Sequence, residues 1–478
     1  MVYELLRRNV VSRPDAPFLV TERRTYSYRQ VHNLAGYLRT QYLHAGSPAG
    51  TVCLNIGAPE VLCGWIWACL MARRDFALLP AIADPGAVST YLQLAGGTLL
   101  VSDLEAFGGW AIPAAPVPEA PEYPSDPAGE PGPGEGTVSF LSSGTSGAAK
   151  LIRVAYAQIT DALACIARED RMPYTRGQCV VITPSLSHSY GFSAMLEYTQ
   201  GGSTIILPAD RSFVGLVRSL MHKALRDRIT AVEGVAYFYQ QLRPLLPRLA
   251  LPNLRHVGFG GDFAEHAFVA ESRQKYPGLT YSVRYGLSEI PSAISVKVHP
   301  PPYPADWESV GRVLGLYQVQ IVDDAGTPLP DGEEGEVVVH YAHPAGGTPE
   351  TRRIATGDTG LLRHGELVIK GRKQFFLKCK GYKIYPAFVE GGVKASGLVE
   401  DVRATARHNK LKIEIIPGSG YRDKNQLLDF LVRHLPDYAV PDIIEETDEI
   451  PRNAAGKIIR AVETSHPDRA QNHLFSNG

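Results

Sequence analysis

Short apolar stretches that could form strands alternate, in the first hundred residues, with a longer stretch that has a helical pattern. The strand-like stretches are residues 52–56 and 98–102, and the helical pattern spans residues 59–71. Two strands joined through a helix usually pair in parallel, because the connection crosses back over the sheet. The alternation therefore predicts an α/β fold with a mostly parallel, helix-covered sheet.

The alternation resumes after a segment rich in proline and glycine. Eight prolines lie between Pro113 and Pro133, so residues 111–136 are predicted to be a surface linker. The stretches expected beyond it are strands over 137–141, 180–182 and 204–207 and a helix over 161–168. We expect this part of the chain, residues 1–371, to be a large domain of several layers, with β-sheets packed by helices.

The sequence changes character near Arg372, where short apolar stretches broken by glycines begin. The elements expected there are short strands within 366–385, a helix over 386–396, strands over 401–406 and 411–416, and a helix over 425–435. These elements suffice for a small α+β domain. We therefore expect a second, mobile domain over residues 372–478.

The bulk composition excludes some classes of function. The chain has 478 residues, with 48 Lys and Arg against 49 Asp and Glu, so its net charge is −1. This balance argues against partners such as nucleic acid or a membrane surface. The six cysteines form no Cys-x-x-Cys pair and no secretory leader is recognisable, so we expect structural thiols in the cytoplasm.

Residues 138–150 read Val-Ser-Phe-Leu-Ser-Ser-Gly-Thr-Ser-Gly-Ala-Ala-Lys, a strand that runs into a loop of hydroxyls and glycines. Glycines expose backbone N–H groups to a ligand, and hydroxyls supply further donors. The spacing GxxGxxK differs from a Walker P-loop, and an ordinary turn is the alternative interpretation. The predicted phosphate-binding residues are Ser142, Ser143, Gly144, Thr145, Ser146, Gly147 and Lys150.

A second segment, residues 450–460, reads Ile-Pro-Arg-Asn-Ala-Ala-Gly-Lys-Ile-Ile-Arg. Together the two segments resemble the opening and closing signatures of the adenylate-forming superfamily, which includes acyl-CoA synthetases, nonribosomal peptide synthetase adenylation domains and luciferases. Ala149 stands where that family usually has proline. The resemblance covers nearly the whole chain and implies activation of a carboxylic acid by ATP. It implies that Lys457 stabilises charge during adenylation.

Three motifs between these segments also resemble the family. In Tyr285-Gly286-Leu287-Ser288-Glu289 the resemblance implies stacking near adenine, approach of a hydroxyl to the α-phosphate, and Mg²⁺ binding by Glu289. Asp358 is implied to bind the ribose, and a glycine turn to lie against adenine. The implied nucleotide contacts are Gly260, Gly261, Asp262, Tyr285, Gly286, Ser288, Asp358 and Arg372, and the implied catalytic residues are Lys457, Glu289 and His188.

The acyl pocket is implied by the position of His188, whose ring borders that pocket in the family. The predicted pocket residues are His188, Tyr190, Glu233, Val235, Tyr239 and Gly286. Their aromatic content suits a small aromatic or short acid. Glu233 could face a substrate amine, and an exposed or salt-bridged glutamate is the alternative.

Six basic residues and no acid lie between Lys370 and Lys383. This pattern is typical either of a solvated hairpin or of a surface that receives phosphates and a phosphopantetheine arm. The family register implies a thiol channel at Lys378, Lys380 and Gly381. It also implies a hinge at Gln374, where the family most often has Asp or Lys.

The resemblance implies an acyl- or aryl-CoA ligase that uses ATP, Mg²⁺ and CoA. The alternative is a free-standing adenylation enzyme that loads the phosphopantetheine of a separate carrier protein, because no carrier domain is expected in the short polar tail after Lys457. A nucleotide-binding relative without catalytic activity is a third hypothesis.

Overall fold

The computed structural model describes residues 2–44, 47, 49–81, 84–103, 112–113, 136–143, 149–261, 264, 266–303, 309–345, 348–372, 377–384 and 386–451. The chain divides into two compact units. The first comprises Met1–Ser142 and Lys150–Phe375, and the second comprises Ser143–Ala149 and Phe376–Gly478. The sequence predicts a domain boundary between residues 371 and 372. The division between the two units lies nearby, between Phe375 and Phe376.

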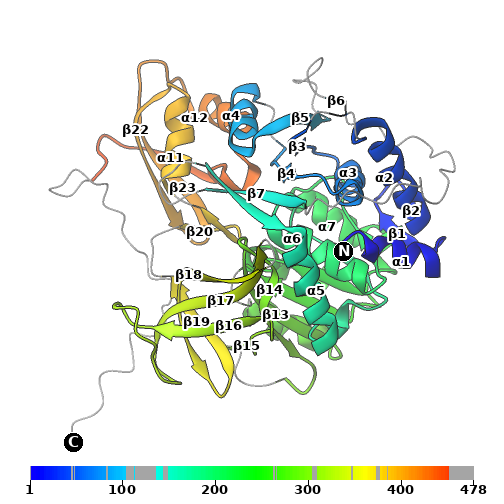
Figure 1. Cartoon of the computed structure of the whole chain (residues 1–478). Helices are drawn as coiled ribbons and strands as arrows, with labels where there is room; N and C mark the ends of the chain where they lie inside the picture. The colour runs from blue at the N-terminus through cyan, green and yellow to red at the C-terminus, as the bar shows by residue number, and fades with distance from the viewer. Residues whose placement is uncertain are drawn as a thin grey trace, which may run out of the picture. The chain divides into compact units, whose positions relative to one another are not determined.

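Eight strands of the first unit form one sheet, whose interior strands are parallel and whose edge strands are antiparallel to their neighbours. From edge to edge the strands are β14 (Ile290–His299), β13 (Thr280–Leu287), β12 (His256–Gly260), β11 (Ala231–Gly234), β9 (Cys179–Ile182), β10 (Thr204–Ile206), β1 (Pro17–Val20) and β2 (Thr25–Ser27). The parallel interior is what alternating strands and helices predict. Helices α5 (Tyr156–Glu169) and α6 (Ser189–Gln200) pack against β14 (Figure 1).

The direction in which the chain crosses this sheet reverses next to β9. From β9 the chain passes through α6 to β10 on one side and then returns to β11 on the other side. In open parallel sheets, ligands bind beyond the carboxyl ends of the strands at such a switch point. The carboxyl ends of β9 and β11, at Ile182 and Gly234, are therefore a favoured place for a site.

A second sheet contains the strands that the first hundred residues predict. Its order is β6 (Ile112–Pro113), β5 (Gly97–Ser102), β3 (Thr51–Asn55), β4 (Phe76–Leu78), β7 (Thr137–Ser143) and β8 (Ala149–Ala155). Strands β3 and β5 pair in parallel, as predicted, although the additional strand β4 lies between them in the chain. Within the predicted linker, Ile112–Pro113 forms β6, and residues 114–135 lie outside the described residues.

A third sheet is antiparallel throughout, and the alternation of strands and helices does not anticipate it. Its order is β15 (Ser309–Gly311), β19 (Glu366–Arg372), β18 (Thr348–Arg363), β17 (Gly335–Ala345) and β16 (Tyr317–Val322). No helix separates these strands in the described part of the chain. Antiparallel strands need only turns between them, so the helix signal that marks the other two sheets is missing.

The helices of the first unit cover its sheets. Helix α3 (Pro59–Ala72) buries residues on all sides, including Trp65 and Trp67, as a helix without a polar face must. The other α-helices that the structure describes in this unit, besides α5 and α6, are α1 (Glu4–Ser12), α2 (Tyr28–Tyr42), α4 (Pro85–Ala95), α7 (Phe213–Met221), α8 (Lys223–Arg226), α9 (Ala236–Leu242) and α10 (His266–Lys275).

The second unit has its own hydrophobic core, which includes Val389, Ile413 and Leu427. Its elements are β20 (Leu377–Cys379), β21 (Tyr382–Ile384), α11 (Pro386–Ala395), β22 (Val399–Arg407), β23 (Lys410–Pro417), α12 (Lys424–His434) and β24 (Ile443–Glu446). The predicted helices and strands are present. The parallel pairing of β24 with β23 was not predicted, because Ile-Ile-Glu-Glu is too charged to read as a strand.

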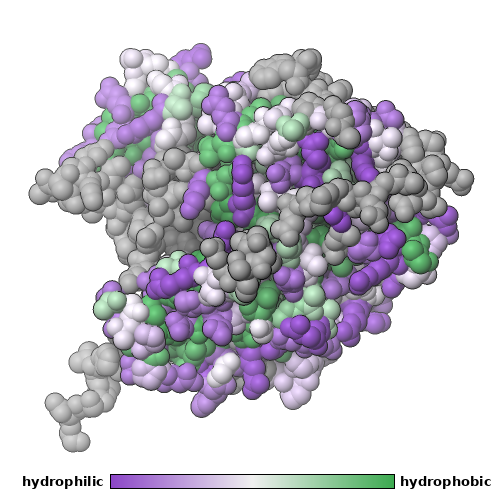
Figure 2. Space-filling view, viewed as in Figure 1, coloured by the Kyte–Doolittle hydropathy of each residue, from purple (hydrophilic) through white to green (hydrophobic). Residues whose placement is uncertain are grey.

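Hydrophilic and hydrophobic side chains are interspersed on the face that Figure 2 shows. The large hydrophobic side chains that are exposed belong to separate elements, apart from Val214 and Met221, which share α7. Across the described ranges, every helix is too short or too polar to span a lipid bilayer.

Candidate functional site

Residues predicted to form the site lie at or after the carboxyl ends of four neighbouring parallel strands. His188 follows β9, Glu233 lies in the last two residues of β11, Gly260 ends β12, and Tyr285 lies near the end of β13. Parallel neighbours carry their carboxyl ends to the same edge of a sheet. The fold therefore gathers these residues, distant in sequence, beside the switch point.

Two predicted nucleotide-binding residues from different motifs are in direct contact. The Tyr285 hydroxyl donates a hydrogen bond of 2.7 Å to Oδ2 of Asp358, and both side chains are buried. Asp358 lies opposite Arg372 in the β18–β19 ladder. The Thr356 hydroxyl accepts a 3.0 Å hydrogen bond from the Asp358 amide, which fixes the backbone at this carboxylate. The positions predicted to stack on adenine and to bind the ribose are thus in contact.

The tip of the β13–β14 hairpin carries the remaining residues of the same motif. Ser288 and Glu289 form its turn, and Oγ of Ser288 lies 3.1 Å from Oγ of Ser189. Glu289 is exposed, so its carboxylate is accessible to a cation. Among the residues that the structure describes, there is no group of three or more His, Cys, Asp or Glu side chains that could hold a metal ion. A magnesium ion here would take its other ligands from phosphates and water.

The glycine turn after β12 is required by close packing. A Cβ atom at Gly260 would lie 2.7 Å from Cζ of Tyr190, nearer than carbon atoms approach. Gly261 has a φ of +77°, in the region that favours glycine. Asp262, the third residue predicted here, lies outside the described residues.

His188 is the residue that precedes α6, and it is half-buried. Burial, and then the positive charge of Arg211, lowers the pKa of His188 to about 4, so the ring is neutral at pH 7. Arg211 donates to the carbonyls of Ile182, Thr183 and Pro184 at 3.0, 2.6 and 2.7 Å. A neutral imidazole beside the end of β9 can offer a hydrogen bond without a charge.

Glu233 has the salt-bridged environment that the sequence left as one alternative. Its carboxylate accepts hydrogen bonds from the hydroxyls of Tyr190 (2.7 Å) and Tyr198 (2.9 Å), and it lies 3.3 Å from Nη2 of Arg284. The side chain is fully buried. The carboxylate oxygens are therefore engaged within the protein.

Tyr239, predicted for the acyl pocket, is fully buried and ties two strands together. Its hydroxyl lies 2.9 Å from the carbonyl oxygens of both Val232 and Gly258, on β11 and β12. Val235 is half-buried and precedes α9. The Tyr239 hydroxyl thus stabilises the sheet beneath the predicted pocket.

Several predicted residues have no described side chain. Ser142 and Ser143 end β7, and Arg372 ends β19, but only their backbones are described. Lys150 is exposed on β8. The predicted residues outside the described ranges are Gly144, Thr145, Ser146, Gly147, Asp262, Gln374 and Lys457.

The predicted thiol-channel residues lie in the second unit, around a tight turn. Lys380 and Gly381 join β20 to β21, with φ values of +56° and +78°. Nζ of Lys380 donates to the carbonyl of Val440 (2.6 Å) and lies 3.1 Å from Oδ1 of Asp442. Lys378 is half-buried on β20. Lys380 is therefore anchored within its own unit.

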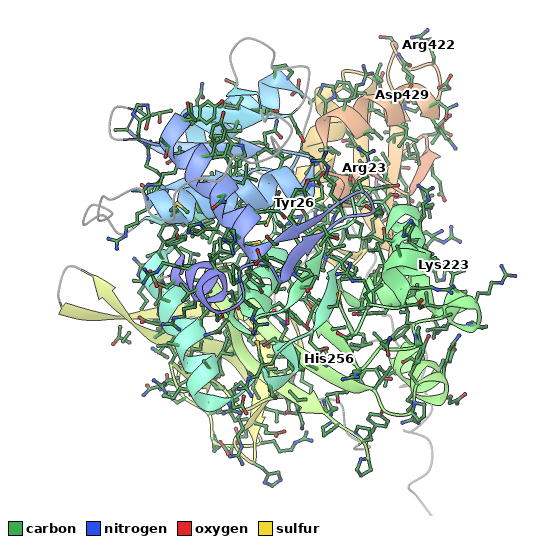
Figure 3. All side chains as sticks on the ribbon, turned by 90° about the vertical axis from the view of Figure 1, so that its right-hand side faces the viewer. Arg23, Tyr26, Lys223, His256, Arg422 and Asp429 are labelled. Atoms are coloured by element: carbon green, nitrogen blue, oxygen red, sulfur yellow. The ribbon has the colours of Figure 1, made fainter. Side chains whose placement is uncertain are left out.

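Sequence reasoning missed a buried ionic cluster behind the site. Nη1 of Arg284 lies 2.5 Å from Oε2 of Glu197, and both side chains are buried. His256, labelled at the start of β12 in Figure 3, lies 3.9 Å from the Glu233 carboxylate and stacks on Tyr174. Glu197 is the one charged residue of α6, and this lone charge is the sequence signal that could have revealed the cluster.

Comparison with known proteins identifies relatives of this chain. The family described as AMP-binding enzyme matches residues 6–347. A long-chain-fatty-acid–CoA ligase of Escherichia coli O6:H1 is 27% identical over 305 residues, covering 59% of this chain and 53% of that protein. The chain thus spans about half the length of the first relatives it matches.

Two other relatives are matched over more of this chain. Feruloyl-CoA synthase of Amycolatopsis sp is 26% identical over 455 residues, covering 90% of this chain and 86% of that protein. A dimodular nonribosomal peptide synthase of Bacillus subtilis is 23% identical over 514 residues, which are 96% of this chain and 21% of that protein.

Solved structures share the fold. A double mutant of o-succinylbenzoate CoA synthetase from Bacillus subtilis has a TM-score of 0.73 at 20% identity, covering 95% of this chain and 97% of that chain. An artificially fused adenylation–PCP di-domain from Klebsiella oxytoca has a TM-score of 0.73 at 17% identity, covering 93% of each chain. The predicted α/β fold class is confirmed. Because the family match extends over well more than half of its residues, the chain belongs to the AMP-binding enzyme family.

Proposed function

We propose that this protein activates a small carboxylic acid with ATP through an acyl-adenylate and transfers the acyl group to a thiol. Membership of the AMP-binding enzyme family supports nucleotide use. The observation that carries the proposal furthest is the contact of Tyr285 with Asp358, with Arg372 opposite Asp358 in the ladder. Positions implied to bind one nucleotide therefore come from two separate sheets, and two of them, Tyr285 and Asp358, are in contact.

In the proposed first step, the substrate carboxylate attacks the α-phosphorus of ATP and pyrophosphate leaves. The carboxylate is already ionised at neutral pH, so no general base is required. Ser288 and the hydroxyls of residues 142–146 would donate hydrogen bonds to phosphate oxygens. Lys457 would stabilise the charge that develops in the transition state.

Glu289 would provide the protein ligand for Mg²⁺. Its exposed carboxylate fits a hard cation that keeps several waters and shares phosphate oxygens with a nucleotide. The ion would neutralise phosphate charge and so favour departure of pyrophosphate. With one carboxylate from the protein, the ion would depend on ATP and water for its other ligands.

In the second step a thiol attacks the carbonyl carbon of the acyl-adenylate, and AMP leaves. We place this step in a channel bordered by Lys378, Lys380 and Gly381, with Gln374 as the hinge of the domain rotation that family members use. The feruloyl-CoA synthase and fatty-acid–CoA ligase relatives favour CoA as the acceptor.

A free-standing adenylation enzyme that loads a carrier protein is the second candidate. It is favoured by the match to a nonribosomal peptide synthase over 96% of this chain. Both candidates share the first step and differ only in what bears the thiol.

The contacts of Glu233 bear on which acid is bound. Because its carboxylate is held by Tyr190, Tyr198 and Arg284, it is not placed to pair with a substrate amine. We therefore expect acids without an amine, bound beside the neutral ring of His188. A small aromatic or short acid fits the aromatic residues of the proposed pocket.

Exchange of labelled pyrophosphate into ATP tests the proposal, using a panel of aryl, fatty, β-amino and α-amino acids. We expect acid-dependent exchange with a small aryl or short acid. Addition of CoA or of a phosphopantetheinylated carrier protein then identifies the acceptor by the thioester formed. Lack of exchange with every acid would favour a catalytically silent relative.

A further inference from the structure

Helix α6 is almost entirely buried, yet one of its faces is polar. Ser189, Ser193 and Glu197 are spaced four residues apart, so they lie on the same face, one above the other. We call these three residues the α6 stripe. Ser193 and Glu197 are 6% and 1% exposed, and polar groups so deeply buried need hydrogen-bond partners.

Every member of the α6 stripe contacts the β13–β14 hairpin. Oγ of Ser189 lies 3.1 Å from Oγ of Ser288, in the turn, and Oγ of Ser193 accepts a 3.1 Å hydrogen bond from the amide of Ser292. Glu197 accepts a hydrogen bond from the Ser292 hydroxyl. The stripe therefore meets the turn and the following strand of the hairpin at successive points.

Glu197 also reaches the other strand of the hairpin. Nη1 of Arg284 donates to its Oε2 at 2.5 Å, and Arg284 is bonded through the backbone to Tyr285. One carboxylate thus holds residues on both sides of the motif Tyr285–Glu289. Glu197 therefore contacts the hairpin on both sides of this motif, at Arg284 before it and at Ser292 after it.

The hairpin is irregular at the point where the stripe holds it. Tyr285 pairs with Ser295 and Leu287 with Ile290, so residues 291–294 stand opposite Gly286 alone. Ser292 has a φ of +67°, an unfavourable conformation for a residue other than glycine. Such a bulge persists only where its surroundings hold it, and two of the bonds described above end on Ser292.

The buried charges of the cluster are weak evidence for a role in stability. Glu197 and Glu233 share Arg284, and all three side chains are buried. Burial raises the pKa of Glu197, and Arg284 opposes the rise. Well-packed apolar residues commonly replace buried ion groups without loss of stability, so a positioning role is the better account.

We propose that the α6 stripe positions the β13–β14 hairpin for nucleotide binding, with Ser193 and Glu197 as positioning residues that never touch the nucleotide. The inference rests on the proposed function in taking the hairpin as part of the ATP site. It adds that ATP affinity depends on side chains of α6 that no motif includes.

Isothermal calorimetry with ATP and Mg²⁺ tests the proposal on the full chain. The variants are Glu197→Gln, Ser193→Ala and Ser292→Ala, each of which removes one contact between stripe and hairpin. We expect the Kd for ATP to rise about tenfold, the effect of losing a hydrogen bond to a charged or strained partner. In acid-dependent exchange, the KM for ATP should rise more than the KM for the acid.

Two matched controls remove buried hydroxyls that the stripe does not use. Thr199→Val removes a hydroxyl of α6 that bonds within its own helix (2.6 Å), and Ser272→Ala removes one that lies 2.8 Å from the Tyr281 hydroxyl, at the other end of β13. We expect both controls to melt earlier than the wild type and to bind ATP with unchanged Kd.

The outcomes separate this inference from the proposed function. If the Kd for ATP rises in proportion to the loss of melting temperature in both stripe and control variants, the positioning role is overturned. It is also overturned if the stripe variants bind ATP with the Kd of the wild type. Failure of the wild type to bind ATP would overturn it too. ATP binding without exchange for any acid would overturn only the proposed function.

Discussion

Gly381 occupies a backbone conformation that restricts what can replace it. Together with Lys380 it forms a two-residue turn with positive φ at both positions, a geometry that suits Asn and Gly. We predict that Gly381→Leu lowers the melting temperature, with a loss of about 1 kcal/mol or more in the free energy of unfolding. Gly381→Asn should keep the turn and still add a side chain.

The asparagine variant separates the channel from the turn. If Gly381 borders the thiol path, Gly381→Asn should slow thioester formation from supplied acyl-adenylate and leave adenylate formation and the melting temperature near normal. Rapid-quench measurement of the two half-reactions is the check. Equal thioester rates in Gly381→Asn and the wild type would remove Gly381 from the channel.

Lys457 should matter in the opposite half-reaction. We predict that Lys457→Ala slows adenylate formation by about a hundredfold, because a preformed charge that favours the transition state is lost. Thioester formation from supplied acyl-adenylate should change little. Comparable losses in both half-reactions would contradict the assigned role.

His256 should make stability depend on pH. Burial, and then the charge of Arg284, lowers the pKa of His256 from 6.5 to about 3. Between these two pH values the unfolded chain therefore binds a proton at His256 and the folded protein does not. The free energy of unfolding should therefore be full above pH 6.5 and fall as the pH decreases toward 3, by up to about 1.4 kcal/mol per pH unit for this residue.

Replacement of His256 by phenylalanine tests this dependence. His256→Phe keeps an aromatic ring against Tyr174 and removes the titrating group. Urea denaturation at pH 4, 5, 6 and 7 should give a shallower decline for His256→Phe than for the wild type. His222→Phe provides the control, since it makes the same substitution at an exposed histidine.

At the scale of elements, β11 and β12 are joined by more than their ladder. Because the Tyr239 hydroxyl bonds a carbonyl on each strand, we predict that Tyr239→Phe lowers the free energy of unfolding by about 1–2 kcal/mol. The preference among acids in pyrophosphate exchange should not change. An altered acid preference with normal stability would place Tyr239 at the pocket surface instead.

The elements that the sequence predicted are those with a local signal. Helix α3 and strands β3 and β5 follow from apolar stretches whose lengths distinguish helix from strand. The contact of Tyr285 with Asp358 spans 73 residues, and only the order of motifs hinted at it. The pair of Arg284 and Glu197 was missed because the lone charge of Glu197 in its helix does not identify a partner. Tertiary packing alone brings a strand and a helix 87 residues apart together.

At the scale of the whole molecule, the second unit has a hydrophobic core of its own. Its buried side chains come mainly from α11, α12 and strands β20 to β23, and Ile444 of β24 packs against them partly buried. We predict that residues 376–478, expressed alone, unfold cooperatively on heating, as a domain with its own core does. A gradual, non-cooperative melt monitored by circular dichroism would show that the unit depends on the rest of the chain.

The parallel pairing of β1 with β10 has a consequence for synthesis on the ribosome. Leu19 pairs with Ile205, and the Tyr28 hydroxyl donates to the carbonyl of Ser203 (2.7 Å). At translation rates of about 5–20 residues per second, the first strand waits roughly 10–40 s for its partner to be made. Apolar residues such as Phe18 stay uncovered during that interval. Nascent chains arrested before residue 200 should therefore recruit chaperones that longer chains release.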